Sequence, residues 1–104
     1  MATFNIGDYK YTTLDTRVKA ETLYKGQTSY DDIPRTVTYN GKTYTVTYLN
    51  NCFKGCTALT TAPTIPNSVT EMGSCFFGCT SLTTAPTIPN SVTEMGLADR
   101  KSVV

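Results

Sequence analysis

The chain repeats itself with a period of 23 residues, and this repeat narrows the possible architectures more than any other feature. The segment LTTAPTIPNSVTEMG occurs twice without a change, at residues 59–73 and 82–96. The register extends beyond these copies to Val46, Val69 and Val92, and to the pairs Cys52/Cys75, Phe53/Phe76, Gly55/Gly78 and Cys56/Cys79. A period of roughly 20–50 residues indicates a solenoid, a propeller or another array. One such unit cannot bury its apolar face alone, so we expect stacked coils that share a core.

The sequence before the repeats predicts a β-rich N-terminal cap. Residues 9–14 and 17–23 are rich in Tyr, Thr and Val, and only Asp15 and Thr16 separate them. This pattern favours a hairpin. Residues 24–32 are expected to form a polar loop.

A second hairpin is predicted over residues 36–49, where Asn40 and Gly41 separate two alternating runs. Both central residues of a type I′ turn need a positive φ, which Asn-Gly tolerates best. The return strand enters the repeat register at Val46, so we place the cap at residues 1–45 and the repeats at residues 46–98.

Each coil is predicted to combine short strands with one tight turn. Residues 82–88 and 92–95 are expected to be extended, with the first segment interrupted at Pro86 because proline lacks an N–H. Residues 74–79 suit a single helical or 3₁₀ turn that ends at Gly78.

These residues resemble the BspA-like leucine-rich repeats of bacterial surface proteins. The family's units carry a Phe-x-x-Cys element, a Leu shortly after it and an Ile-Pro-x-x-Val turn. The matching residues here are Phe53, Cys56, Leu59, Ile65, Pro66 and Val69, and then Phe76, Cys79, Leu82, Ile88, Pro89 and Val92. The resemblance covers about residues 33–98. The predicted strand segment contains Ala-Pro, in LTTAPTIP, and in this it is closer to the related repeats of mycoplasma-type surface lipoproteins. It implies a mainly β, leucine-rich-repeat solenoid with a β-hairpin cap.

Composition excludes several kinds of function. The chain has no histidine, which removes the Ser-His-Asp triad, the Cys-His pair and every histidine metal ligand. A formal net charge of +1 gives no electrostatic sign of nucleic acid or an anionic membrane as a partner. No Gly-rich phosphate loop is present, and no apolar run approaches the ~18–20 residues of a membrane span. We therefore expect no cofactor, no catalytic residue, no nucleic acid and no membrane insertion. The first residues also show no secretory signal pattern.

The four cysteines, Cys52, Cys56, Cys75 and Cys79, have three interpretations. The period favours buried thiols, each stacked over its copy in the next coil, since free Cys is often buried. Disulfides are the first alternative. A zinc tetrathiolate is the second, because zinc ligands are commonly spaced two to four residues apart.

Candidate binding residues are the threonines that repeat on the predicted strand side. They are Thr60, Thr61 and Thr64, with their copies Thr83, Thr84 and Thr87. A Thr array can order water against ice, but two coils with a proline inside them make a poor flat lattice. Exposed tyrosines are a second candidate, either Tyr44 and Tyr48 or Tyr9 and Tyr11, because Tyr is favoured at interfaces.

The repeat register stops after Ala98. The repeat predicts Phe, Gly and Cys at positions that hold Asp99, Lys101 and Ser102. Residues 99–104, DRKSVV, are what the sequencing-adapter text GATCGGAAGAGCGTCGTG encodes, so we predict a non-native tail and a truncated fragment of a longer repeat protein. An uncapped last coil would expose apolar residues and favour end-to-end self-association.

By resemblance, then, the sequence predicts a non-catalytic module for adhesion or protein binding at a bacterial or virion surface. A structural spacer with no ligand of its own is the alternative. The sequence does not name the partner.

Overall fold

The computed structural model describes residues 1–93, and these are mainly β, with five strands and no helix. The strands are β1 (Thr3–Ile6), β2 (Tyr9–Thr13), β3 (Arg17–Thr22), β4 (Thr36–Tyr39) and β5 (Lys42–Tyr48). Accordingly, nothing in this range is a helix long and apolar enough to cross a membrane. The predicted start of a third coil beyond Thr93 and the predicted tail at 99–104 lie outside the described residues.

The strands form one sheet in the order β1-β2-β3-β5-β4. The predicted hairpin of β2 and β3 is confirmed, with Thr13 opposite Val18 and Asp15 and Thr16 at its tip. The sequence did not indicate β1, which pairs antiparallel with β2. It also gave no sign that β3 and β5 pair in parallel, which joins the two hairpins into one sheet.

The predicted Asn-Gly turn between β4 and β5 is confirmed. Asn40 has a φ of 52° and Gly41 a φ of 77°, as a type I′ turn requires, and Tyr39 pairs with Lys42 across it. This turn fixes the register of β5, and thereby the point at which the chain enters the repeats.

The sheet is curled into a half-barrel. β1 and β4 lie at opposite edges of the strand order, yet Phe4 of β1 stacks on Tyr39 of β4 with ring centroids 4.3 Å apart and planes 2° apart. Tyr11 and Tyr44 also lie against Phe4. Large aromatic side chains therefore fill the concave face and hold the two edges together.

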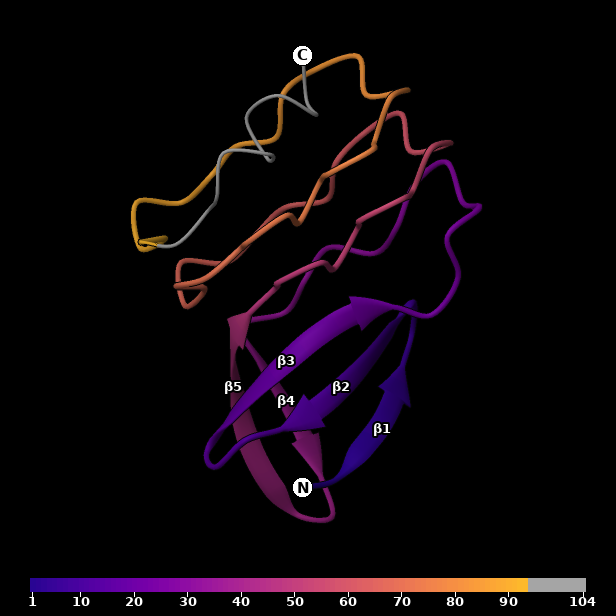
Figure 1. The fold of residues 1–104 in the computed structure, drawn as a ribbon. Coiled ribbons are helices and arrows are strands. Elements are labelled where there is room, and N and C mark those ends of the chain that lie inside the picture. The colour runs from indigo at the N-terminus through magenta and orange to yellow at the C-terminus, as the bar shows by residue number, and fades with distance from the viewer. Residues whose placement is uncertain (94–104) are drawn as a thin grey trace.

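From Val46, which lies within β5, the chain forms two windings, the first at residues 46–68 and the second at residues 69–91. Figure 1 shows them as parallel layers that rise from the sheet. Backbone amides of the first winding donate to carbonyls 22 residues further along, from Leu49 to Glu71 (2.9 Å) and from Phe53 to Cys75 (2.9 Å). On the opposite side the direction reverses, and the Thr70 amide donates to Thr47 (2.9 Å). The predicted spacing is thus reproduced by hydrogen bonds between the layers.

The secondary structure inside the windings differs from the prediction. In residues 49–93 the structure has no strand, and Tyr48 and Glu71 form an isolated parallel bridge. The prolines explain the missing strands, because Pro63 and Pro86 each remove a ladder donor. The predicted helical or 3₁₀ turn is a hydrogen-bonded turn, and it ends, as expected, at a glycine: Gly55 and Gly78 have φ values of 80° and 83°.

The predicted polar loop between β3 and β4 is a structural layer beneath the first winding. Ile33 donates from its amide to the Thr64 carbonyl (3.1 Å), and the Thr60 amide donates to Thr28 (3.0 Å). Tyr30 and Ile33 are buried. The loop therefore takes the place that the first winding takes beneath the second (Figure 1).

A glycine-to-alanine substitution tests the turn that sets the register. We expect Gly41→Ala to lower the free energy of unfolding by about 1–2 kcal/mol, because an L side chain is strained at positive φ. A Cβ at Gly41 would meet no atom within 4 Å, so the loss isolates the backbone effect. Urea unfolding gives the value.

Gly26→Ala is the matched control for this substitution. A Cβ at Gly26 would also meet no atom within 4 Å, but this residue has no positive φ. The free energy of unfolding of this variant should stay within a few tenths of a kcal/mol of the wild type or rise slightly, as reduced chain entropy predicts. Equal losses in the two variants would contradict the assignment of the turn.

Candidate binding surface

The six predicted threonines are all exposed in the structure. They lie on the two windings at equivalent positions, so each residue of the first winding has its copy on the second. They do not lie on strands, which corrects the predicted strand face, because the prolines between them remove ladder donors. The structure therefore presents a polar surface of repeated hydroxyl and methyl groups on irregular but layered backbone.

Hydroxyl groups tie the layers together on this surface. The amide and the Oγ1 hydroxyl of Thr83 both donate to the Thr60 carbonyl (3.3 Å each). The amide and hydroxyl of Thr60 donate in turn to the Thr28 carbonyl (3.0 and 3.2 Å). Thr28, which is outside the repeat and so was missed from the sequence, extends the column to a third layer.

Similar hydroxyl contacts recur along the windings with the same period. Thr93 and Thr70 donate from Oγ1 to Thr70 and Thr47, while Ser91 and Ser68 donate to the Val69 and Val46 carbonyls at 2.6 and 2.7 Å. A short side chain held at both its backbone and its hydroxyl has few conformations to lose when a ligand binds. The repeated Ser and Thr residues supply this rigidity. Their 23-residue period is the feature of the sequence that could have identified these hydroxyl contacts.

An acidic side chain borders the threonine surface. Asp32 accepts a hydrogen bond from the Thr64 amide at 2.8 Å, and Asp31 donates from its amide to Asp8 (2.7 Å). The Asp32 and Asp8 carboxylates thus each accept from a backbone amide, the first from the first winding and the second from the loop. Among residues 1–93, no group of three or more Cys, Asp or Glu side chains is placed to hold a metal ion.

The four cysteines lie in the core as free thiols. Cys52, Cys56, Cys75 and Cys79 are at most 1% exposed. Cys79 donates from its thiol to the Phe53 carbonyl (3.1 Å), and the Tyr30 hydroxyl donates to the Cys56 sulfur (3.5 Å). The repeat therefore uses the thiols as interior packing groups, as their stacking predicts.

The four candidate tyrosines fall into a buried pair and a half-buried pair. Tyr9 and Tyr11 are 1% exposed and belong to the core, so the prediction that they could serve as a binding surface is wrong. Tyr9 faces inward because it packs edge-on against Phe53, at 6.0 Å between ring centroids. Tyr44 and Tyr48 are half-buried. Arg17 lies over the Tyr48 ring and donates to its hydroxyl (2.6 Å), so this tyrosine is engaged within the sheet.

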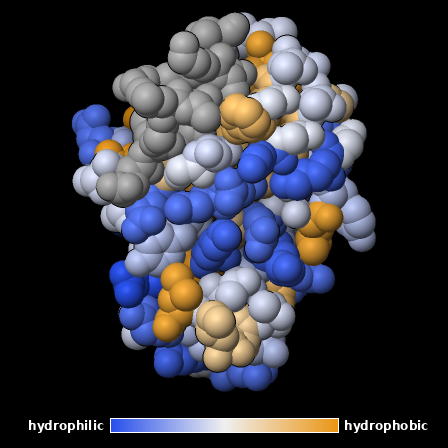
Figure 2. Space-filling view, viewed as in Figure 1, coloured by the Kyte–Doolittle hydropathy of each residue, from blue (hydrophilic) through white to orange (hydrophobic). Residues whose placement is uncertain are grey.

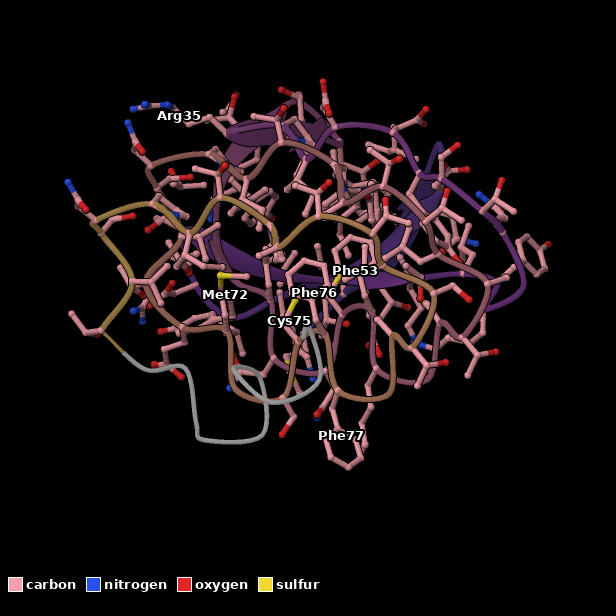
Figure 3. The ribbon with its side chains drawn as sticks, turned by 90° about the horizontal axis from the view of Figure 1, so that it is seen from above. Arg35, Phe53, Met72, Cys75, Phe76 and Phe77 are labelled. Atoms are coloured by element: carbon pink, nitrogen blue, oxygen red, sulfur yellow. The ribbon has the colours of Figure 1, made fainter. Side chains whose placement is uncertain are left out.

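The most exposed aromatic residues were not singled out from the sequence. Tyr24 is 69% exposed, in the loop after β3, and Phe77 is 46% exposed, at the tight turn of the second winding. Figure 3 shows Phe77 pointing away from the windings, whereas its neighbours Cys75 and Phe76 point inward. Lys54, the equivalent residue one winding earlier, lies over the Phe77 ring at 5.8 Å.

On the face shown in Figure 2, the hydrophilic and hydrophobic groups are dispersed. On the face shown in Figure 2, hydrophilic side chains form a band across the middle and hydrophobic ones lie in small separate patches. The threonine surface is a periodic polar array, and it contains no convergent titratable groups of the kind that acid–base chemistry needs.

Comparison with known proteins identifies the class of fold. The structure is similar to the crystal structure of a leucine-rich repeat protein from Bacteroides ovatus, with a TM-score of 0.60 and 23% sequence identity. The similarity covers 95% of this chain and 33% of that protein, so this chain spans about a third of its length. No protein-family model and no curated protein matches the sequence. The fold is therefore that of a leucine-rich-repeat-like protein.

A thiol titration tests the state of the cysteines. We expect four free thiols per chain in denaturant without reductant, because the structure contains no disulfide in the described residues. In the native state the thiols should react much more slowly, since all four are buried. A colorimetric thiol reagent gives both values, and fewer than four thiols in the denatured chain would contradict the structure.

Stability should fall at alkaline pH. Burial raises the pKa of Cys79 and of Tyr11 to about 12, and burial raises the pKa of Cys52 and of Tyr9 far above their usual values. The unfolded chain loses these protons first, from about pH 9 for the thiols and about pH 10 for the phenols. The stabilisation is thus complete below about pH 9 and is lost as the pH rises toward the folded pKa values. The free energy of unfolding in urea should fall by several kcal/mol between about pH 8 and about pH 10.5, since each of the two thiols alone accounts for about 2 kcal/mol.

Cys79→Ala provides the control for this pH dependence. The variant removes one buried thiol and its bond to Phe53, so it should be less stable at pH near 8 but lose less stability as the pH rises. Parallel curves for the variant and the wild type would show that the Cys79 thiol does not contribute.

Proposed function

We propose that this chain is a non-catalytic protein-binding module built from a leucine-rich-repeat solenoid, used for adhesion or protein recognition at a bacterial or virion surface. The observation that carries the proposal is the exposed threonine surface, whose groups recur one winding apart on hydrogen-bonded layers. The leucine-rich repeat protein of similar fold supports the repeat architecture. The surface location and the BspA-like relationship rest on the resemblance of the repeat sequence.

A repeated surface favours a protein ligand in extended form. Hydrogen-bonded layers lie about 4.8 Å apart, and each layer offers the same hydroxyl and methyl groups. A polypeptide lying across the layers would meet these groups in succession, with its own amides and carbonyls opposite threonine hydroxyls. A lone small molecule would use only part of such an array.

The proposal excludes catalysis for physical reasons. Cys52 and Cys79 are held neutral, because burial raises the pKa of both thiols, so these two do not supply a thiolate nucleophile. Burial likewise raises the pKa of Tyr9 and Tyr30, which bond to backbone carbonyls of the loop. These thiol and phenol groups thus pack in the core of the protein.

The alternative is a structural spacer that binds nothing. It is favoured by the same layered hydrogen bonds, which make the windings stiff along their axis. The two functions differ in one measurable respect, because a spacer has no ligand on its threonine surface.

A paired-variant binding assay tests the proposal. The full chain is used to select ligands from a displayed library of random peptides, and the affinity of the selected peptides is measured by calorimetry. Thr61→Lys with Thr84→Lys should weaken their binding at least tenfold, because bulk and charge are placed on two equivalent exposed positions.

Thr57→Lys with Thr80→Lys is the matched control. These two threonines are also exposed and also one winding apart, but they follow the glycines of the tight turns. Binding should be retained in this variant. Selection of no peptide would favour the spacer, and equal losses in the two double variants would show that the threonine surface is not the binding site.

A further inference from the structure

The four cysteines form two pairs, and the two pairs have the same 23-residue spacing. Cys52 lies one winding below Cys75, and Cys56 lies one winding below Cys79. All four are in the half of each winding that contains the tight turn, which we call the turn half; the other half, with the threonine surface, is the threonine half. The period treats the two pairs as equal, so only the contacts of each thiol can distinguish them.

The thiols of Cys56 and Cys79 are engaged with other groups. The Cys79 thiol donates to the Phe53 carbonyl at 3.1 Å. The Cys56 sulfur accepts from the Tyr30 hydroxyl at 3.5 Å and lies 4.0 Å from the Thr22 hydroxyl. Tyr30 belongs to the loop layer and Thr22 to β3, so the partners of the Cys56 sulfur lie beneath the first winding, away from Cys79.

Cys52 and Cys75, by contrast, lie opposite each other on hydrogen-bonded layers. The Asn51 amide donates to the Gly73 carbonyl and the Phe53 amide to the Cys75 carbonyl, each at 2.9 Å, so these bonds flank Cys52 on both sides. Backbones paired in this way are about 4.8 Å apart, inside the Cα range of ~4.4–6.8 Å that a disulfide needs. Burial raises the pKa of Cys52, and a hydrogen bond between its thiol and that of Cys75 adds to this shift.

We propose that Cys52 and Cys75 are a redox-dependent cross-link, which closes into a disulfide between the two windings when the protein meets a peroxide. Both side chains are 0% exposed and share one core, so the bridge joins layers that are already in place. Cys56 and Cys79 remain thiols. The bridge closes a loop that contains one whole winding, and it thereby ties the second winding to the first.

The chemistry is a two-electron oxidation in two steps. A thiolate of the pair attacks one oxygen of hydrogen peroxide, the O–O bond breaks, and a sulfenic acid forms while the departing hydroxide takes up a proton to give water. The second thiol then attacks the sulfenic sulfur, and the S–O bond breaks with release of a second water. Because burial keeps Cys52 neutral between the closed layers, the reaction waits for a brief local opening and is slow.

Peptide mapping of the oxidised chain tests the proposal. The whole folded chain is incubated with hydrogen peroxide, the remaining thiols are blocked in denaturant, and the chain is cleaved without reductant. Cleavage after Phe53, Glu71 and Phe76 places the four cysteines on four separate peptides. We expect a mass loss of two hydrogens, two free thiols in denaturant, and one linked pair of peptides that contains Cys52 and Cys75.

The Cys56/Cys79 pair is the matched control, since it has the same spacing and is equally buried. Cys56→Ala with Cys79→Ala should still lose both remaining thiols on oxidation, whereas Cys52→Ala with Cys75→Ala should keep both. The melting midpoint of the wild type should rise by about 10 °C on oxidation and return on reduction, because the bridge constrains the unfolded chain.

Four free thiols after oxidation, oxidised sulfurs without a bridge, or a bridge that joins any other pair would overturn the proposal. A bridge between Cys52 and Cys75 that leaves the melting midpoint unchanged would do so too, because it would not hold the windings together. The mapping uses the wild-type chain, so it decides the pairing even if a cysteine variant does not fold. The pair lies outside the threonine half, so these results are independent of peptide binding.

Discussion

The Phe53 side chain connects the sheet, the loop layer and the windings in one core. Its ring contacts the sheet through Tyr9, the loop layer through Tyr30 and the second winding through Phe76, with centroids 6.0, 5.5 and 5.1 Å away. The aromatic contacts continue from Tyr9 to Tyr11, Phe4 and Tyr39, and so reach the seam where the two edges of the sheet meet. Sheet and windings therefore share one core, because a ring of this size at the junction fills the space between unlike elements. The layered fold depends on this junction, since the first winding has nothing of its own kind beneath it.

The sequence predicted those features that depend on local chemistry or on the repeat. Asn40 and Gly41 gave the turn and the β5 register, and the period gave the stacked Phe, Cys and Val positions. No such signal predicted three other features. These are strand β1, the parallel pairing of β3 with β5, and the burial of Tyr9 and Tyr11. Each depends on where a distant segment lies, and a short strand such as β1 gains its stability from the sheet rather than from its own sequence. The loop layer was missed for the same reason: its partners, Thr60 and Thr64, are 32 residues away from Thr28 and Asp32.

The sequence indicated which threonines would be exposed, but it did not indicate the backbone conformation that carries them. All six threonines are exposed, as a period applied to Thr suggests, yet the prolines that share their segments prevent regular strands. Hydrogen bonds between layers still form, because the residues other than proline keep their backbone N–H groups. Thr70 and Thr83 are two of these donors. The hydroxyl groups then add a second bond to the same carbonyls. A Thr-Pro-rich repeat can thus be ordered without a β ladder, provided that its neighbours are copies of itself.

The differences between the two windings show which parts of the repeat are open to change. The unlike pairs are Tyr48/Glu71, Leu49/Met72, Asn50/Gly73, Asn51/Ser74, Lys54/Phe77 and Ala58/Ser81. Of these only Leu49 and Met72 are buried, and they are of similar size, so the core is preserved. The other changes lie on the outside of the turn half, while the threonine half is the same in both. If the threonine surface is the binding site proposed above, its two copies offer a ligand the same contacts twice. For a ligand that is itself repetitive, the second contact forms at a high effective concentration, so modest affinity at each winding gives firm attachment overall. The turn half, with Lys54 in one winding and Phe77 in the next, offers no such repetition.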